Sequence, residues 1–344
     1  MTLELKQLNQ LSLAAMAQVL LSHGALPEHT WRSAAQIAQA LGCAPRHAWV
    51  LRRWQVALLN AGWLREDQGR LAWHDRPQAP QLEQLPRLYT ALGFAASMAT
   101  LHRRVIEHLP ELLRDQRALA PLLFESGEPV AVLGAYQCNR YTAAINRALG
   151  DRARTVKATG ERLQVLELGG GAGHTTEAVL SALQGRALEY RFSDLSAMFK
   201  VAAQRQFRLE PDMCFELIDI DRPLLEQGID AGSLDVVIAG NVLHNAHDLP
   251  RTLGHIRAAL RPGATLLFSE SIADNPAMLT FMHLLLSPAE GMPARASDEV
   301  FLPVKAWRSA LHASGFALVE VWPDEQQPLA EAGQRLFLAV EGER

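Results

Sequence analysis

Apolar runs and amphipathic segments alternate through the second half of the chain. Five apolar runs have the composition of buried strands, at residues 163–170, 188–196, 213–221, 234–241 and 265–271. Segments with apolar residues at helical spacing alternate with them, at residues 174–184, 197–207 and 249–260. This order predicts a doubly wound parallel sheet of the α/β class. Two further strands, 316–323 and 334–342, have no helix between them, so we expect an antiparallel hairpin at the sheet edge.

The first 75 residues show a different pattern. Apolar residues recur at helical spacing from residue 33 to residue 64, with breaks at Gly42 and Pro45. A polar turn that contains Gly69 then separates two short strands. Helix, turn, helix and hairpin in this order predict a winged-helix-like N-terminal region at residues 1–75.

The rest of the chain divides into two predicted regions. Residues 76–150 begin with a proline-rich stretch and continue as short helical segments, which predicts a linker and a helical lid region. Residues 151–344 contain all the predicted strands of the large sheet. An insertion at residues 271–303 interrupts them and is long enough to complete the lid.

The composition is that of a soluble globular protein. The 344 residues are 49% hydrophobic and carry a formal net charge of −4, whereas proteins that bind nucleic acid phosphates are usually basic. Cys43, Cys138 and Cys214 lie far apart without a CxxC pair, so we expect neither a metal site nor a disulfide framework. A reducing cytoplasm fits this pattern. No apolar run approaches the roughly 18 residues that a membrane span needs.

A glycine-rich turn follows the first predicted strand of the sheet. Gly169, Gly171 and Gly173 lie where this strand leads into a helix, so the backbone can approach a ligand and the helix can offer free N–H groups. A phosphate-binding Walker loop would need Gly-Lys-Ser/Thr, and a G-x-G-x-x-G fingerprint fails because His174 takes its sixth position. The pattern present is E-x-G-x-G-x-G, beginning at Glu167.

Acidic residues end the next two strands. Asp194 ends the second strand, where a carboxylate can accept hydrogen bonds from both hydroxyls of a ribose. Asp219 follows the third strand, placed to meet an adenine amino group, and Ile220 can pack on the ring. Ligands of doubly wound sheets bind outside the carboxyl ends of the strands. We therefore expect a nucleotide here, with a glycine-rich turn that binds no ligand as the alternative.

Two polar residues follow the fourth strand and end the fifth. His244 lies just after the fourth strand, and Glu270 ends the fifth. Consecutive strands of this kind are expected to be neighbours, about 5 Å apart. A carboxylate that accepts the N–H of one ring nitrogen fixes the tautomer of a histidine and raises the basicity of the other nitrogen. The two residues are therefore either a base and its orienting group or solvated loop residues.

The chain resembles a known family in four stretches. These stretches are residues 109–124, 135–149, 190–199 and 238–270. They are similar to motifs of the methyltransferase domains of polyketide and nonribosomal peptide synthases. Those domains are class I S-adenosylmethionine (SAM) methyltransferases. The resemblance runs from about residue 100 to the C-terminus. It implies a Rossmann-like sheet of seven strands with an antiparallel last strand, preceded by a small, mainly helical region.

The resemblance also implies a cofactor and a site. The expected cofactor is SAM, which leaves as S-adenosylhomocysteine. Its expected binding residues are Glu167, Gly169, Gly171, Gly173, Asp194, Leu195, Asp219, Ile220 and Asn241. Asn241 is expected either to contact the donor or to hold its loop. In carbon-methylating members of the family a His and a Glu at the positions of His244 and Glu270 form a catalytic dyad. Tyr136 matches a family tyrosine and is either a donor to a developing enolate oxygen or a packing residue.

Neighbouring residues have simpler interpretations. His247 lies three residues from His244, a spacing that metals can use, but without a third candidate ligand we interpret it as a surface residue. Thr175 and Thr176 are expected to cap the helix that follows the glycine-rich turn. Trp307 is expected in the core.

The implied reaction is methylation of the α-carbon of a β-ketoacyl thioester, or of a similar activated carbon, in natural-product biosynthesis. Methylation of oxygen or nitrogen on a small molecule is the first alternative. The second is a winged-helix DNA-binding protein or a SAM-binding protein without catalysis. The basic residues in or next to the second helix of the winged-helix-like region favour DNA binding. They are Arg46, Arg52 and Arg53. Apolar residues of the same helix favour packing within the chain or against a second subunit, at Trp49, Leu51, Trp54 and Val56.

The expected partners follow from this reaction. They are a small-molecule or carrier-protein-bound acyl substrate and the synthase or carrier protein that presents it, while nucleic acid and membrane are not expected. A homodimer is a further possible assembly. The chain begins at Met1 and ends soon after the last strand, so we expect a stand-alone enzyme that acts in trans, with a domain excised from a synthase as the alternative.

Overall fold

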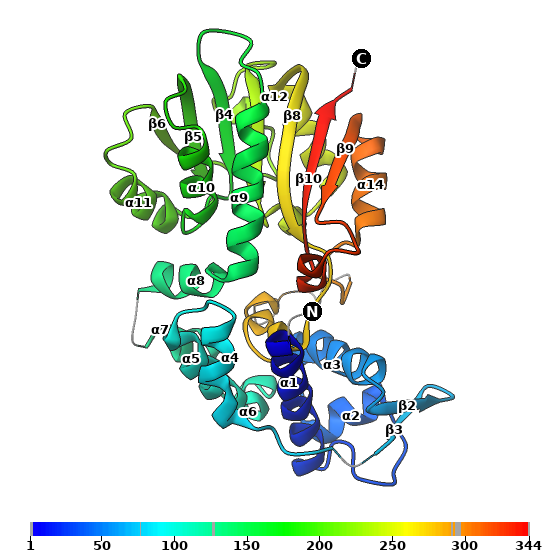
Figure 1. Ribbon diagram of the computed structural model, residues 1–344. Coiled ribbons are helices and arrows are strands. Elements are labelled where there is room, and N and C mark those ends of the chain that lie inside the picture. The colour runs from blue at the N-terminus through cyan, green and yellow to red at the C-terminus, as the bar shows by residue number, and fades with distance from the viewer. Residues whose placement is uncertain (1–2, 76, 126–127, 290–291, 293–296, 343–344) are drawn as a thin grey trace. The chain divides into compact units, whose positions relative to one another are not determined.

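The computed structural model describes residues 3–75, 77–125, 128–289, 292 and 297–342 (Figure 1). The chain forms two compact units. Unit 1 contains Met1–Pro129 and Asp274–Val300, and unit 2 contains Val130–Ala273 and Phe301–Arg344. The domain boundary expected after residue 150 falls inside a helix of unit 2, α9 (Arg140–Thr155), because this helix packs along the large sheet.

A sheet of seven strands forms the centre of unit 2, in the order β6-β5-β4-β7-β8-β10-β9. The strands are β4 (Leu163–Leu168), β5 (Leu188–Asp194), β6 (Met213–Leu217), β7 (Leu234–Gly240), β8 (Leu260–Ser271), β9 (Phe316–Trp322) and β10 (Gln334–Glu341). The first five pair in parallel, and β10 lies antiparallel between β8 and β9. The predicted Rossmann-like sheet with an antiparallel last strand is confirmed.

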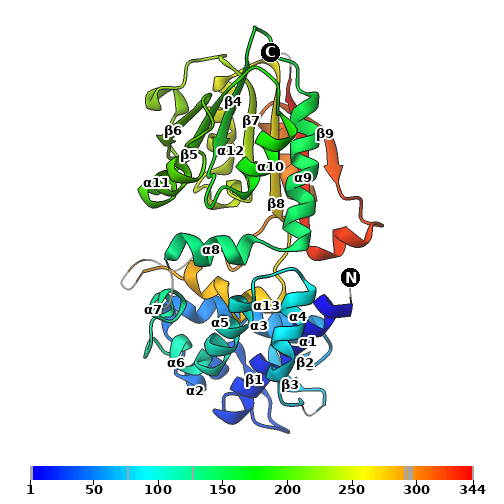
Figure 2. The same cartoon turned by 60° about the vertical axis from the view of Figure 1, so that its left-hand side comes forward.

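Helices cover both faces of this sheet (Figure 2). They are α9, α10 (His174–Ala182), α11 (Ala197–Gln206), α12 (Leu249–Ala259) and α14 (Val304–Ala313). Unit 2 also contains α8 (Pro129–Gln137) and the short 3₁₀ turns η3 (Leu224–Gln227), η4 (Leu243–Asn245) and η6 (Pro328–Ala332). One core lies between the sheet and the pair α9 and α10, and a second lies under α12 and α14. Trp307 of α14 is fully buried in the second core, as predicted.

The N-terminal part of unit 1 has the predicted winged-helix order. Its elements are α1 (Leu3–Ser22), β1 (Arg32–Ser33), α2 (Ala34–Leu41), η1 (Pro45–His47), α3 (Ala48–Asn60), β2 (Leu64–Asp67) and β3 (Arg70–Trp73). Ser33 begins α2 with a capping box to Gln36, and Gly42 ends it in the left-handed conformation. Gln68 and Gly69 both have positive φ and form the tight turn of the β2–β3 hairpin.

The rest of unit 1 is helical. It contains η2 (Leu82–Gln84), α4 (Leu85–Ala91), α5 (Ala96–Glu107), α6 (Leu109–Leu113) and α7 (Leu119–Phe124), and the returning segment adds α13 (Pro276–Leu279) and η5 (Met282–Leu286). The segments expected to form a lid therefore divide between the units, because residues 85–129 and 274–300 belong to unit 1 and residues 130–150 to unit 2. No helix in the described part of the chain is long and apolar enough to cross a membrane.

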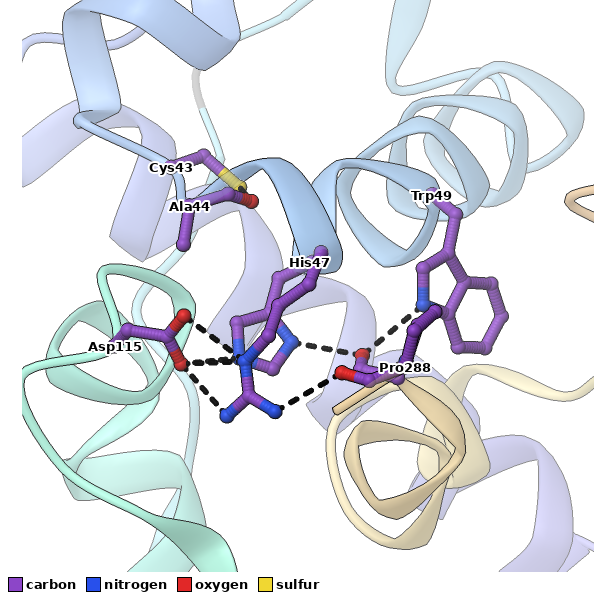
Figure 3. Close-up of polar contacts among 8 residues, drawn as sticks. Cys43, Ala44, His47, Trp49, Asp115 and Pro288 are labelled. Carbon is purple, nitrogen blue, oxygen red and sulfur yellow. Dashed lines mark hydrogen bonds and ion pairs between the residues drawn. The ribbon is translucent and has the colours of Figure 1, made fainter. Parts of the chain in front are cut away.

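Buried polar contacts fix the returning segment to the winged-helix part of unit 1. Figure 3 shows the imidazole of His47 beside the carboxylate of Asp115, with Nε2 2.9 Å from Oδ1. The Nδ1 atom of His47 lies 2.7 Å from the hydroxyl of Ser287, which also accepts a hydrogen bond of 3.0 Å from the indole N–H of Trp49. The indole of Trp54 donates to the carbonyl of Leu279 at 2.9 Å.

Three arginines lie in or just before α3, the helix that a DNA-binding winged helix would place against DNA, and all three are paired within unit 1. They form the ion pairs Arg46–Asp115, Arg52–Asp298 and Arg53–Asp274, at 2.7, 2.6 and 2.8 Å. Charges already neutralised by carboxylates are poorly placed to bind a phosphate backbone.

The apolar residues of α3 pack as expected, with one exception. Trp49, Leu51 and Trp54 are buried. Val56 was expected to pack with them, but its side chain is 39% exposed because it lies on the outer face of the helix.

Candidate active site

The predicted nucleotide residues other than Asn241 lie at the carboxyl ends of three adjacent strands, β4, β5 and β6, whereas Asn241 follows β7. Gly169 follows β4, Asp194 ends β5, and Asp219 comes two positions after the end of β6. All three strands run in the same direction, so these residues share one edge of the sheet. The structure therefore brings together the three signals that the sequence placed far apart.

The glycine-rich turn has a backbone shape that residues other than glycine rarely adopt. Gly169, Gly171 and Gly173 have φ values of 61°, 54° and 82°, in the left-handed region. A Cβ atom on Gly169 would clash with Val242, and one on Gly170 would clash with Phe192. A Cβ on Gly171 would meet no atom closer than 3.8 Å. The turn is thus packed on its inner side and more open at Gly171.

Asp194 supports this turn from the neighbouring strand. Its Oδ2 accepts a hydrogen bond of 3.0 Å from the Gly171 N–H, and its Oδ1 accepts one of 2.8 Å from the Ser196 N–H. Burial raises the pKa of Asp194, and the backbone N–H groups of Ser196, Gly171 and Leu195 oppose this rise. The carboxylate therefore couples the turn to the end of β5.

Glu167 lies beneath the turn and is fully buried. Its Oε2 accepts hydrogen bonds of 2.6 Å from the Thr176 hydroxyl and 2.8 Å from the Tyr190 hydroxyl. Burial raises its pKa to about 7. The expectation that Thr176 caps α10 is wrong, since Gly173 is the N-cap residue without a side-chain cap and the Thr176 hydroxyl is bound to Glu167.

The other expected nucleotide residues differ in exposure. Asp219 accepts a hydrogen bond of 2.9 Å from the Asp221 N–H, which orders the turn after β6. Ile220 is partly buried against the core under α12. Leu195 is 71% exposed and leaves an apolar surface next to Asp194.

His244 and Glu270 are in direct contact. His244 lies in η4, just after β7, and Glu270 lies near the end of β8, the parallel neighbour of β7. The Nδ1 atom of His244 is 2.7 Å from Oε2 of Glu270. The other oxygen, Oε1, accepts backbone hydrogen bonds from Leu243 at 2.7 Å and from His244 at 3.3 Å.

This contact orients the imidazole of His244. Glu270 is fully buried and accepts two backbone N–H groups through Oε1, which leaves Oε2 for Nδ1 of His244. Nε2 is the ring nitrogen that is not bound to Glu270. The His244 side chain is only 8% exposed and faces the Phe301 ring at a centroid distance of 5.0 Å and an angle of 70°.

The histidine loop and the glycine-rich turn touch each other. Val242, two residues before His244, occupies the space that a Cβ on Gly169 would need. A Cβ on Gly240, at the end of β7, would lie 2.5 Å from the hydroxyl of Thr175 in α10. Glycines at both positions therefore let the two predicted parts of the site approach closely.

Two further predicted residues lie in unit 2. Tyr136 belongs to α8, and burial raises its pKa. A hydrogen bond of 3.0 Å between the imidazole of His174 and the Gly134 carbonyl joins α8 to α10. His247 is 90% exposed and pairs with Asp221, which raises its pKa, so it lies on the surface as expected. The described residues hold no group of three or more side chains suited to a metal ion.

Sequence reasoning did not anticipate Phe301 or the two backbone N–H groups that hold Glu270. Phe301 follows the returning segment and is far from His244 in sequence, and no periodic pattern links them. A backbone donor has no signature in the side-chain pattern. Only the tertiary structure could identify either feature.

Comparisons with known proteins agree with this geometry. Residues 166–266 match the family described as "Methyltransferase domain". The chain is 32% identical over 300 residues to the polyketide synthase ThaQ of Burkholderia thailandensis, an alignment that covers 78% of this chain and 14% of the synthase. It is 31% identical over 326 residues to ThaG of the same organism, covering 88% of this chain and 6% of that synthase. The chain thus spans a small part of the curated relatives that it matches.

Solved structures share the whole fold. The CurJ carbon methyltransferase superimposes with a TM-score of 0.83 at 26% identity, covering 98% of this chain and 92% of that one. The DszA carbon methyltransferase superimposes with a TM-score of 0.80 at 25% identity, covering 100% and 92%. The sheet and the glycine-rich turn, together with these matches, define a class I SAM-dependent methyltransferase. In particular, the chain resembles the carbon methyltransferase domains of polyketide and nonribosomal peptide synthases.

Proposed function

We propose that the protein methylates the α-carbon of a β-ketoacyl thioester, with His244 as the base and Glu270 as the group that orients it. The observation that carries the proposal is the bond of 2.7 Å between Nδ1 of His244 and the buried carboxylate of Glu270. A carbon between two carbonyls must lose a proton before it can attack a methyl group. A neutral imidazole with a fixed tautomer suits that task near neutral pH.

The chain's own residues move this proton. Nε2 of His244 accepts it, and the ring becomes a cation beside the Glu270 carboxylate. Because Glu270 is buried, the attraction between the two charges is weakly screened and stabilises the protonated ring. Burial of the ring also limits the access of water to the base. When bound, SAM supplies the electrophilic methyl group that the deprotonated carbon receives.

We further propose how the chain holds SAM. The positive φ values and the more open side of the glycine-rich turn at Gly171 fit a ligand that approaches the backbone. Asp194 is proposed to accept hydrogen bonds from the ribose, and Asp219 to accept one from the adenine amino group, with Leu195 and Ile220 against the ring. Glu167 is proposed to support the turn from below, since its carboxylate is bound to Thr176 and Tyr190.

Tyr136 is proposed to lie near the acceptor and to donate a hydrogen bond to the developing enolate oxygen. Its helix α8 is tied to α10 next to the glycine-rich turn, which supports this role. A raised pKa keeps the phenol protonated and therefore able to donate.

The proposed substrate is bound to a carrier protein. The relatives of this chain are polyketide synthases, whose names connect them with acyl chain assembly. Carbon is proposed as the acceptor because the solved structures with the same overall fold are named carbon methyltransferases. Oxygen and nitrogen acceptors remain the alternative outcome of the test below.

The test uses the whole protein with SAM carrying a ¹³C-labelled methyl group. Acceptors are a β-ketoacyl thioester, the matching β-hydroxyacyl thioester, a primary amine and a phenol. We expect label only with the β-ketoacyl thioester. When that thioester also carries ¹³C at its α-carbon, a one-bond ¹³C–¹³C coupling in the product shows a new bond to the α-carbon. Label found on oxygen or nitrogen alone would overturn the proposal.

A further inference from the structure

Asn241 has an unusual backbone conformation and a specific set of contacts. Its φ is 55°, in the left-handed region that residues other than glycine rarely adopt, although asparagine tolerates it better than most. Its backbone N–H donates to the Ser269 carbonyl at 2.7 Å. Its side-chain Oδ1 accepts a hydrogen bond of 2.8 Å from the Ser271 N–H. The two bonded residues are the immediate neighbours of Glu270 in β8.

These contacts extend the parallel pairing of β7 and β8 by one residue, but a side-chain oxygen accepts one of the two hydrogen bonds in place of a backbone carbonyl. In a parallel pair, one residue donates its N–H to one position of the neighbouring strand and accepts through its carbonyl from the position two residues on. Asn241 makes the first bond through its backbone and the second through its side chain. The amide oxygen thus takes the place of the main-chain carbonyl, and the backbone is released from the sheet.

The released backbone turns directly into η4. This turn directs the N–H groups of Leu243 and His244 to Oε1 of Glu270 and places the His244 ring against Oε2. The positions of both Glu270 and His244 therefore depend on Asn241. Asn241 holds Glu270 through hydrogen bonds to its two neighbours in β8, and it places His244 because its backbone conformation turns the chain into η4.

We propose that Asn241 is a positioning residue for the His244–Glu270 pair rather than a contact of the cofactor. This rests on the proposed roles of His244 and Glu270 as base and orienting group. Asn241 holds both neighbours of the buried carboxylate, Ser269 through its backbone N–H and Ser271 through its side-chain amide oxygen, and so limits the movement of Glu270. Small errors in the placement of a base cost large factors in rate.

Two substitutions separate the backbone role from the side-chain role. Asn241→Gly keeps the left-handed conformation, which glycine adopts freely, and removes the acceptor for Ser271. Asn241→Asp keeps the acceptor and adds a negative charge close to the pair. Asn245→Ala is the matched control, because Asn245 lies in the same loop and is exposed.

Kinetics of the whole 344-residue chain give the first readout. We expect Asn241→Gly to lower kcat about tenfold or more and to leave the KM for SAM within about twofold of the native value. We expect Asn241→Asp to keep most of the activity at high pH, while the acid limb of its pH–rate profile moves up by about half a pH unit or more, since a second carboxylate favours the protonated ring. A raised KM for SAM with unchanged kcat in Asn241→Gly would overturn the proposal in favour of a cofactor contact.

The second readout needs no substrate. In ¹⁵N-resolved spectra of the protein labelled at histidine, the Nδ1–H of His244 should be protected in the native chain and in Asn245→Ala, and should exchange at least about tenfold faster in Asn241→Gly. Equal protection in Asn241→Gly would show that Asn241 does not hold the pair. If instead His244→Ala keeps its activity while the exchange result is as expected, the proposed base is wrong and the positioning contact stands.

Discussion

The Nδ1 atom of His244 lies 2.7 Å from Oε2 of Glu270, across the boundary between the parallel strands β7 and β8. The carboxylate is fully buried, and its second oxygen binds the backbone N–H groups of Leu243 and His244. Three donors thus converge on one acidic side chain. The result is a histidine held in one orientation at the edge of the sheet that also carries the glycine-rich turn.

Replacement of the histidine tests the proposed base. His244→Ala should lower the rate of methyl transfer by about a hundredfold or more, the usual size of a general-base contribution. SAM affinity measured by calorimetry should change little, because the proposed nucleotide contacts lie on other strands. His247→Ala is the control, since His247 lies in the same loop and is 90% exposed. Substantial activity in His244→Ala would make His244 a loop residue.

Replacement of the glutamate tests whether the two residues act as a unit. Glu270→Gln should lower kcat less than His244→Ala, because the amide can keep its place while the charge that stabilises the protonated ring is lost. The double variant should be little slower than His244→Ala alone. Steady-state kinetics of the three variants check this expectation, and effects that multiply in the double variant would contradict it.

Asp194 links the proposed ribose site to the glycine-rich turn. Asp194→Ala should weaken the binding of S-adenosylhomocysteine by about 1–3 kcal/mol, because a charged acceptor for the ribose and for the Gly171 N–H is lost. Isothermal titration calorimetry measures the change. The exposed residue Asp230, replaced by alanine, provides the control. Heat with NADH but none with S-adenosylhomocysteine in the native protein would contradict the nucleotide assignment.

Glu167 should make stability depend on pH in a predictable direction. Burial raises its pKa from 4.5 to about 7, so the folded protein binds a proton that the unfolded chain has released between these values. The free energy of unfolding should therefore fall as pH rises through this range, by up to about 1.4 kcal/mol per pH unit. Glu167→Gln removes the titrating group. Urea unfolding between pH 5 and pH 8 should show a smaller decrease in the variant, and parallel curves would contradict the expectation.

Ser287 is expected to stabilise unit 1. Ser287→Ala removes a partner of two buried side chains, the imidazole of His47 and the indole of Trp49. Loss of hydrogen bonds to buried groups should lower the free energy of unfolding by about 1–3 kcal/mol. Ser22→Ala is the control, because Ser22 is exposed and bonds only within its own helix. Thermal unfolding that shifts equally in both variants would argue against this contact as an anchor.

The order of elements could be predicted almost completely from sequence, because period and composition report directly on burial. The strands and helices of unit 2 and the hairpin of unit 1 lie where the apolar pattern indicates them. Errors occurred where the pattern says nothing about partners. Thr176 was expected at a helix cap and lies against Glu167, and Val56 was expected to pack and is exposed. A hydroxyl has several possible acceptors, and only the packed chain selects one.

The sequence by itself determined the class of fold, the glycine-rich turn and the candidate pair His244 and Glu270, because strands, turns and the polar residues that end strands can be recognised from residue types along the chain. The tertiary structure decided how the pair is held. The convergence of Leu243 and His244 N–H groups on Glu270, and the replacement of a sheet carbonyl by the Asn241 side chain, depend on distances between β7 and β8. Such contacts join residues far apart in sequence through the backbone, whose hydrogen bonds are chemically the same at almost every position and therefore leave no pattern along the chain.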